Sequence, residues 1–283
     1  MVIKSVADEQ QLDTARTLFW DDIETAKPGV SRHESKTWEQ WSVDTRGIVS
    51  GAMAQGAGAW QIRGLPAVKS AFAQIWQEED LIVSMDCALI WLPWKGPHNC
   101  GRLPQTEGLH LDQNPVSKPG FECVQGMVPL YEVNELSGGL AVVPGSHSGM
   151  EHDWRKQFAG KGDWCQMPCN DVVQGREKLV VADAGDLILW DARTVHGGVV
   201  GPGEDTTAAS NTPRLARLSQ TVSMVPRLRA SPECLAARRQ GFMDGITFNH
   251  SPHETGSSSG TVFCLKRRGY NPPQLTDAQA SLL

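Results

Sequence analysis

The stretch GLHLDQNP, residues 108–115, places a histidine and an aspartate two residues apart within an apolar-leaning segment. On an extended strand, side chains at positions i and i+2 lie on the same face, so we expect His110 and Asp112 to point the same way. Such a pair can hold a metal ion if a third ligand joins it. The alternative interpretation is structural: His110 is a hydrogen-bonded core histidine, and Asp112 caps the turn that Asn114-Pro115 begins.

A candidate for the third ligand lies in GDLILWDARTVHGG, residues 185–198. The run LILW is typical of a buried strand, and His196 follows where that strand would end. Two histidines and one carboxylate form the facial triad that binds non-haem Fe(II) and leaves three coordination positions open. We therefore predict that His110, Asp112 and His196 are metal ligands. Each motif taken alone has a structural alternative, because histidines near strand ends are commonly only hydrogen-bonded.

A fourth polar residue lies on a later strand, in NTPRLARLSQTVSMVP, residues 211–226. Arg217 begins a strand-like run, and Ser219 shares its face. An arginine that points inward keeps its charge and needs an anion, and a co-substrate carboxylate would accept two hydrogen bonds from its guanidinium. Ser219 would add a hydroxyl donor. The alternative for Arg217 is a surface ion pair with a carboxylate of the loop at 203–205.

Hydrophobic spacing predicts helices near both ends of the chain. Residues 7–26 and 65–78 carry apolar side chains at helical intervals, and Asp8 is placed to cap the first of these helices. A last short helix is expected near the C-terminus, with Thr276 or Asp277 as its cap.

From residue 81 onward the pattern predicts strands. Short apolar runs, beginning with LIVSMDCALIWL at 81–92, alternate with Gly, Pro and Asn. This pattern is typical of an antiparallel sandwich or barrel, and without regular helices between the runs a doubly wound α/β sheet is disfavoured. We expect a single domain over residues 1–283, with a helical part at about 1–80, a β core at about 81–230 and a tail at 231–283.

Composition disfavours several classes of protein. The formal charge of −6 over 283 residues leaves no basic footprint for nucleic acid. No apolar run approaches the roughly 18 residues that a membrane span requires, and the N-terminal MVIKSVADEQQLD is too polar for a secretory signal. Seven scattered cysteines without a CxxC pair favour reduced thiols. We therefore expect a cytoplasmic protein that acts on a small molecule; its oligomeric state is not predicted.

The order of these motifs resembles the phytanoyl-CoA dioxygenase family. Between the HxD motif and GDLILWDARTVHG lies VQGMVPLYEVNELSGGLAVVPGSH, residues 124–147, whose Gly-Gly and Pro-Gly-Ser-His steps are more distinctive than the ligands themselves. The similarity extends from about residue 84 to residue 226. It implies a mainly β fold, a double-stranded β-helix (jelly-roll, cupin-like) with N-terminal and flanking helices. It also implies the cofactor Fe(II) and the co-substrates 2-oxoglutarate and O₂.

The resemblance also assigns roles to individual residues. His110, Asp112 and His196 match the iron ligands, and Arg217 matches the arginine that binds 2-oxoglutarate. Gln125 matches a position that lines the same pocket. The interval between His196 and Arg217 is longer than usual in the family, so Arg214 stays a second candidate. Trp190, in the strand before His196, is expected either to fill the core or to line the pocket.

The implied activity is oxidation of a C–H bond in a small organic molecule, with release of succinate and CO₂. Related halogenases lack the carboxylate ligand, so Asp112 favours hydroxylation, or the desaturation and ring closure that the same chemistry can give. Two alternatives stay open: a cupin-like metal protein that uses no 2-oxoglutarate, and a non-catalytic binding protein. Substrate contacts are expected from the N-terminal region and from loops at 94–106, 150–170 and 200–213. Three other histidines are expected to be solvated in loops: His98, His250 and His253.

Overall fold

The computed structural model describes residues 1–41, 43–149, 158–167, 173, 175–203, 212–255 and 270–283. The first two predicted helices are confirmed as α1 (Glu9–Ala26) and α3 (Pro66–Trp76). Asp8 caps α1 by accepting a hydrogen bond from the backbone N–H of Gln11, whose side chain returns a bond to the Asp8 backbone. Thr276 caps the short C-terminal helix α7 (Asp277–Ala280) in the same way.

The segment between α1 and α3 had no predicted structure. It contains the 3-10 helices η1 (Ser35–Gln40) and η2 (Gly51–Gln55) and the helix α2 (Ala57–Arg63). The described residues also include three further helical elements: α4 (Ser146–Gly149), η5 (Arg227–Arg229) and α6 (Pro232–Asp244).

The strands form two antiparallel sheets. The larger sheet has the order β1-β10-β6-β12-β4-β2, and β3 also pairs with β12. Its strands are β1 (Val2–Ile3), β2 (Ile48–Val49), β3 (Leu81–Val83), β4 (Ala88–Trp91), β6 (Val124–Pro129), β10 (Leu187–Asp191) and β12 (Arg217–Pro226). The smaller sheet has the order β8-β5-β11-β7-β9. Its strands are β5 (His110–Leu111), β7 (Gly138–Val142), β8 (Cys165–Gln166), β9 (Lys178–Leu179) and β11 (His196–Val200).

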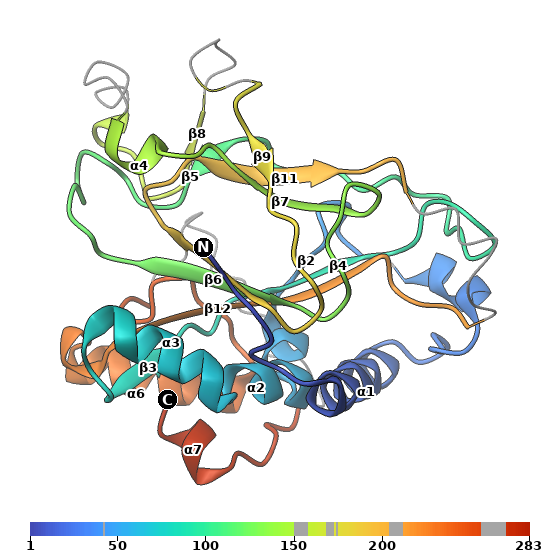
Figure 1. Ribbon diagram of the computed structural model, residues 1–283. Coiled ribbons are helices and arrows are strands. Elements are labelled where there is room, and N and C mark those ends of the chain that lie inside the picture. Colours follow the sequence, from blue (N-terminus) through green and yellow to red (C-terminus); the bar gives the residue numbers. More distant parts are fainter. Residues whose placement is uncertain (42, 150–157, 168–172, 174, 204–211, 256–269) are drawn as a thin grey trace.

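The two sheets lie face to face, and helices α1, α2, α3 and α6 cover the outer face of the larger sheet (Figure 1). Alternation along β12 divides its side chains between the two faces. Leu218, Val222 and Met224 pack into the main hydrophobic core with Phe72 of α3. Arg217 and Ser219 therefore face the space between the sheets.

The same inner face continues across the larger sheet. Gln125 on β6 is the direct partner of Ser223 on β12 and of Trp190 on β10. Directly paired residues of an antiparallel sheet share a face, so these side chains also point toward the smaller sheet. A second apolar cluster, which includes Met127, Leu140 and Ile188, fills part of the space between the sheets. Polar residues of the larger sheet thus meet the smaller sheet, which carries the histidines.

Candidate metal centre

The two histidines are brought together by strand pairing. His110 on β5 is the direct Cα partner of His196 on β11, and their ring centroids lie 4.5 Å apart. Asp112 follows β5, with Oδ2 at 3.2 Å from His196 Nε2 and Oδ1 at 3.8 Å from His110 Nε2. One ligand atom from each of the three residues lies within 4.8 Å of the others. The structure therefore gathers the three predicted ligands into one group.

Both imidazoles are oriented by backbone carbonyl groups. His110 Nδ1 lies 2.9 Å from the carbonyl oxygen of Gly108, and His196 Nδ1 lies 2.9 Å from that of Thr194. A carbonyl only accepts hydrogen bonds, so each Nδ1 must carry the proton. The lone pair of each Nε2 is then directed toward Asp112 and is free to bind a cation. This is the usual arrangement of metal-binding histidines, so the donor set fits a metal ion.

Electrostatics within the group also favour a cation. Burial by itself raises the pKa of Asp112, but the combined effect of His110, His250 and His196 outweighs it and holds that pKa well below the usual range. Burial and the neighbouring His196 lower the pKa of His110. Burial also disfavours charge on His196, but the adjacent Asp112 carboxylate raises its pKa. The carboxylate thus stays ionised among imidazoles.

Two further residues hold Asp112 in place. Gln125 Nε2 donates a hydrogen bond of 2.8 Å to Asp112 Oδ2, and its own Oε1 is buried without a partner. His250 Nε2 lies 2.9 Å from the backbone oxygen of Asp112. The prediction that His250 is solvated was wrong, because the segment after α6 folds back against the site and buries it. No pattern in the sequence predicts that this segment contacts the site.

The alternative role of Asp112, as the cap of the following turn, is not seen in the structure. Asn114 caps that turn instead, by accepting hydrogen bonds from the backbone N–H groups of Val116 and Ser117.

The Pro-Gly-Ser-His step also supports the site. Ser146 Oγ accepts a hydrogen bond of 2.8 Å from the backbone N–H of Val195, the residue before His196. Gly197, the residue after it, lies so close to β5 that an added Cβ would come within 2.5 Å of the Gly108 oxygen. That oxygen is the one that orients His110, so the close approach requires glycine.

Arg217 lies between the sheets with an unbalanced charge. Only 6% of its surface is exposed, and its guanidinium lies 4.7 Å from the centre of the Trp91 ring. Its Nη2 contacts Met127 Sδ at 3.4 Å, whereas its Nε is buried without a partner. Burial lowers the pKa of Arg217 to about 10. Within the described part of the chain it forms no ion pair with a carboxylate, so a surface salt bridge does not account for it. The proposed partner loop at 203–205 lies partly outside the described residues.

Two neighbours of Arg217 were also predicted as co-substrate residues: Ser219 on the same strand, and Arg214 three residues before the strand begins. Ser219 is fully buried, and its Oγ has no hydrogen-bond partner. Arg214, the second candidate for the co-substrate arginine, is exposed, with its guanidinium 5.6 Å from the Tyr131 ring centre. The inner face of β12 therefore carries two polar groups without hydrogen-bond partners, Arg217 Nε and Ser219 Oγ. Arg214 does not lie on that face.

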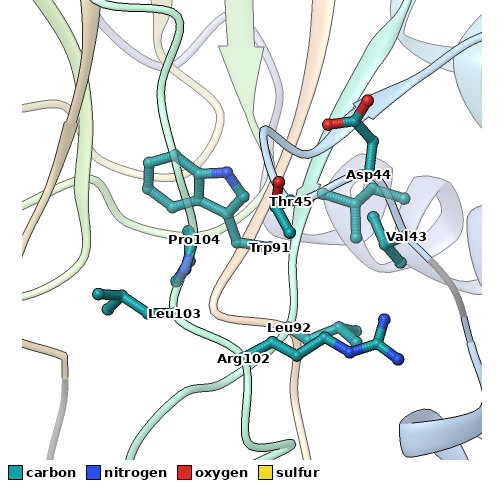
Figure 2. A pocket seen from close by; sticks show the side chains of 9 residues that line it. Val43, Asp44, Thr45, Trp91, Leu92, Arg102, Leu103 and Pro104 are labelled. Atoms are coloured by element: carbon teal, nitrogen blue, oxygen red, sulfur yellow. The ribbon is translucent and has the colours of Figure 1, made fainter.

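A separate pocket adjoins Trp91. Figure 2 shows Val43, Asp44 and Thr45 on one side of this pocket, with Arg102 and Leu103 among the residues that close it. Among the residues that line this pocket, Trp91 is the one whose ring also contacts the Arg217 guanidinium. Because the pocket contains none of the three predicted ligands, the candidate centre is the His-Asp-His group.

Two tryptophans flank that group. The Trp190 ring centroid lies 5.4 Å from that of His196, and the Trp164 ring centroid lies 6.0 Å from that of His110. Trp190 was predicted as a core or pocket residue, and it is half-buried beside a candidate ligand. Trp164 was not singled out, because it follows no motif and its position depends on how β8 pairs with β5.

Two sheets around a buried His-Asp-His group define a class of protein, the non-haem metalloenzymes built on a double-stranded β-helix. Residues 27–199, more than half of the chain, match the family described as phytanoyl-CoA dioxygenase (PhyH). The chain belongs to this family. It is accordingly a non-haem iron- and 2-oxoglutarate-dependent enzyme.

Relatives and solved structures agree with this assignment. Ava biosynthesis cluster protein O from Aspergillus versicolor is 27% identical, over 80% of this chain and 73% of that protein. A putative phytanoyl-CoA dioxygenase from Dictyostelium discoideum is 22% identical, over 70% of this chain and 67% of that protein.

Among solved structures, the epimerase SnoN in complex with Fe³⁺, α-ketoglutarate and nogalamycin RO superposes with a TM-score of 0.54 at 16% identity, covering 98% of this chain and 91% of SnoN. HygX from Streptomyces hygroscopicus, solved with nickel and 2-oxoglutarate, gives a TM-score of 0.50 at 13% identity, covering 80% of this chain and 82% of HygX. At these identities the likeness concerns the fold, and the predicted double-stranded β-helix is confirmed. Among the described residues, no helix has the length and apolar character needed to cross a bilayer.

Proposed function

We propose that this enzyme oxidises a C–H bond of a small organic molecule, by hydroxylation, with conversion of 2-oxoglutarate to succinate and CO₂. The observation that carries the proposal is the convergence of His110, Asp112 and His196, with both Nε2 lone pairs available. The carboxylate ligand supports hydroxylation over halogenation, because it occupies the coordination position that a halide would need. When bound, iron with 2-oxoglutarate and O₂ supplies the oxidising power.

The inner face of β12 would bind the co-substrate. 2-Oxoglutarate carries two carboxylates, and a buried guanidinium without an anionic partner is costly to maintain unless an anion completes it. Arg217 would pair with the carboxylate remote from the metal, and the unpartnered Ser219 hydroxyl would add a hydrogen bond to it. The exposure of Arg214 supports Arg217 as the residue in this role.

The remaining residues would position the ligands. Gln125 holds one oxygen of Asp112, and the carbonyl oxygens of Gly108 and Thr194 hold the two imidazoles. Gln125 was predicted to line the 2-oxoglutarate pocket, and its free Oε1 keeps that contact available. A preorganised ligand set of this kind lowers the cost of binding the metal.

Two alternatives have less support. A cupin-like protein that uses no 2-oxoglutarate would leave the buried Arg217 guanidinium without an anion to bind. A non-catalytic protein would need neither the triad nor that guanidinium. We also propose one domain over residues 1–283 and a cytoplasmic location, the latter supported by the free thiols of Cys87, Cys100, Cys123, Cys165 and Cys234.

The proposed function is tested by succinate formation. Purified protein with ferrous iron and 2-oxoglutarate in air should form succinate slowly even without substrate, and Asp112→Ala should reduce this to the background rate because the triad loses its only anionic ligand. Asp80→Ala, which removes an exposed carboxylate at the far end of β12, is the matched control and should keep the wild-type rate. Equal succinate formation by Asp112→Ala and wild-type protein would refute the assignment.

A further inference from the structure

The two tryptophans beside the triad differ from other tryptophans of the chain in their hydrogen bonding. The indole nitrogens of Trp164 and Trp190 are buried, yet neither has a partner. Trp94, away from the histidines, shares this feature, but three other tryptophans donate the indole N–H to the protein: Trp38 to the Ser31 oxygen, Trp76 to the Met224 oxygen and Trp91 to the Arg46 oxygen. Folded proteins seldom leave a buried N–H unpaired, because its lost hydration is then not replaced.

Neither the metal nor 2-oxoglutarate accounts for these donors. An indole N–H has no lone pair to offer a cation, so it is not a ligand. The remote carboxylate of 2-oxoglutarate would be held by Arg217 and Ser219, whose unpartnered atoms lie on β12, and its other carboxylate would be held by the metal. Two donors therefore remain for a third molecule, one beside each histidine of the triad.

The rings are also placed to contact such a molecule. Trp164 neighbours His110 at 6.0 Å, His110 neighbours His196 at 4.5 Å, and His196 neighbours Trp190 at 5.4 Å between ring centroids. Both indoles are half-buried, so part of each ring stays accessible while its nitrogen is covered. An aromatic ring and an unpartnered N–H donor thus occur together beside each histidine of the triad.

Trp164 is held rigidly. The next residue, Cys165, pairs with Leu111 of β5, directly beside His110. The preceding residue, Asp163, accepts a hydrogen bond of 2.6 Å from Lys118 Nζ. Asn114 Nδ2 donates to the backbone oxygens of the same segment, at 2.9 Å to residue 161 and 3.1 Å to residue 162. A residue whose backbone is fixed in this way loses less freedom on binding a ligand, which favours a role in recognition.

We propose that Trp164 and Trp190 bind the substrate, and that the substrate is a flat, unsaturated ring system that carries carbonyl or phenolic oxygen. Flat rings pack against indole by offset or edge contacts, and their oxygens accept the two N–H groups. A saturated alkyl chain offers no flat surface to either ring, even where it ends in an acceptor such as a carboxylate. The inference rests on the proposed function, because it takes the triad as the reaction centre.

The test uses the full chain loaded with Ni(II) and 2-oxoglutarate, with 1,8-dihydroxyanthraquinone as the flat probe and decanoate as the saturated one. Calorimetry should show binding of the quinone in preference to decanoate. Trp164→Phe keeps a ring but loses the donor and should weaken quinone binding about fivefold, and Trp164→Ala about thirtyfold, the sizes expected for one hydrogen bond and for a ring contact added to it.

Trp94→Phe is the matched control. Trp94 also has a buried, unpartnered indole nitrogen, but its ring neighbours that of Trp91, away from the histidines, so this variant should bind the quinone as the wild type does. Stronger binding of decanoate, absent binding of the quinone, or equal losses in the Trp94 and Trp164 phenylalanine variants would overturn the inference.

Separate titrations distinguish the two proposals. Ni(II) and 2-oxoglutarate affinities should be the same in Trp164→Phe and wild-type protein. If wild-type protein binds neither of them, the proposed function fails. If it binds both but not the quinone, only the substrate inference fails.

Discussion

At the scale of single residues, the site depends on atoms that fix the three ligands. Gln125 donates to the same Asp112 oxygen that lies nearest His196. Residues in this position orient a metal-binding carboxylate and contribute strongly to affinity although they never touch the metal.

We therefore expect Gln125→Ala to weaken Ni(II) binding about tenfold or more, because such supporting contacts are typically worth 10- to 100-fold in metal affinity. The measurement is a calorimetric titration of metal-free protein. Gln240→Ala changes an exposed glutamine of α6 and should leave the affinity unaltered. An unchanged affinity in Gln125→Ala would show that the hydrogen bond does not support the ligand set.

The ligands could be predicted from sequence and their supports could not. His110 and Asp112 follow from the i, i+2 rule, and His196 from its place after a buried strand. The contact of Gln125 with Asp112 depends on how the two sheets stack, and His250 reaches the site from a segment that has no periodic pattern. Such long-range contacts are absent from local sequence signals.

At the scale of elements, strong local signals predicted structure well and short elements were missed. The capping box of α1 and the apolar spacing of α3 are local, and both helices are confirmed. The run at 81–92 was predicted as one β-rich segment, but it is divided into β3 and β4. Between them, the Ser84 N–H donates to the Ser223 oxygen, the Ser223 N–H donates to the Ser84 hydroxyl, and Arg63 donates to the Asp86 backbone oxygen. Strands of two residues, such as β1 and β2, are too short to show a period.

Helix α2 shows how one element stabilises the start of another. Its N-cap, Gly56, has no side chain, and the carboxylate of Asp22 from α1 takes that place by accepting a bond of 3.4 Å from the backbone N–H of Gly58. Burial raises the pKa of Asp22 to about 6 despite that hydrogen bond. A carboxyl whose pKa is raised on folding stabilises the fold below its unfolded pKa, and this contribution is lost as pH rises through about 6.

We therefore expect Asp22→Asn to become more stable relative to wild type as pH rises from about 4 to 7, because the amide never ionises. The gain at pH 7 should be about 1–2 kcal/mol, after allowance for solvent screening of a half-buried group. Thermal unfolding across this pH range measures it. Gln10→Ala, at an exposed position of the same helix, changes no titratable group and should give a pH-independent difference. A constant difference for Asp22→Asn would contradict the account.

At the scale of the whole molecule, one face of each sheet is devoted to the site. The smaller sheet supplies the paired histidines, and the larger sheet supplies Gln125, Trp190 and Arg217 from its inner face. The alternation of side chains along β12 makes this possible, because its other face serves the main core. The order of motifs predicted the fold class, since each motif marks a strand of the same double-stranded β-helix.

The C-terminal part is held to this framework by buried charge. Arg238 of α6 donates to the backbone oxygens of Val83, Pro252 and Leu282, and only 1% of its surface is exposed. These bonds fix the segment that carries His250. Composition gives no sign of such an arrangement, since an arginine in a polar helix is normally exposed.

The most direct measurement of the central claim is calorimetric titration of the Ni(II)-loaded protein with 2-oxoglutarate. We expect one 2-oxoglutarate per metal, with Arg217→Met weakening binding about 100-fold because a charge-assisted pair is lost. Arg214→Met, at the exposed arginine three residues earlier, should bind as the wild type does. Unchanged binding in Arg217→Met, or a loss in Arg214→Met alone, would contradict the account.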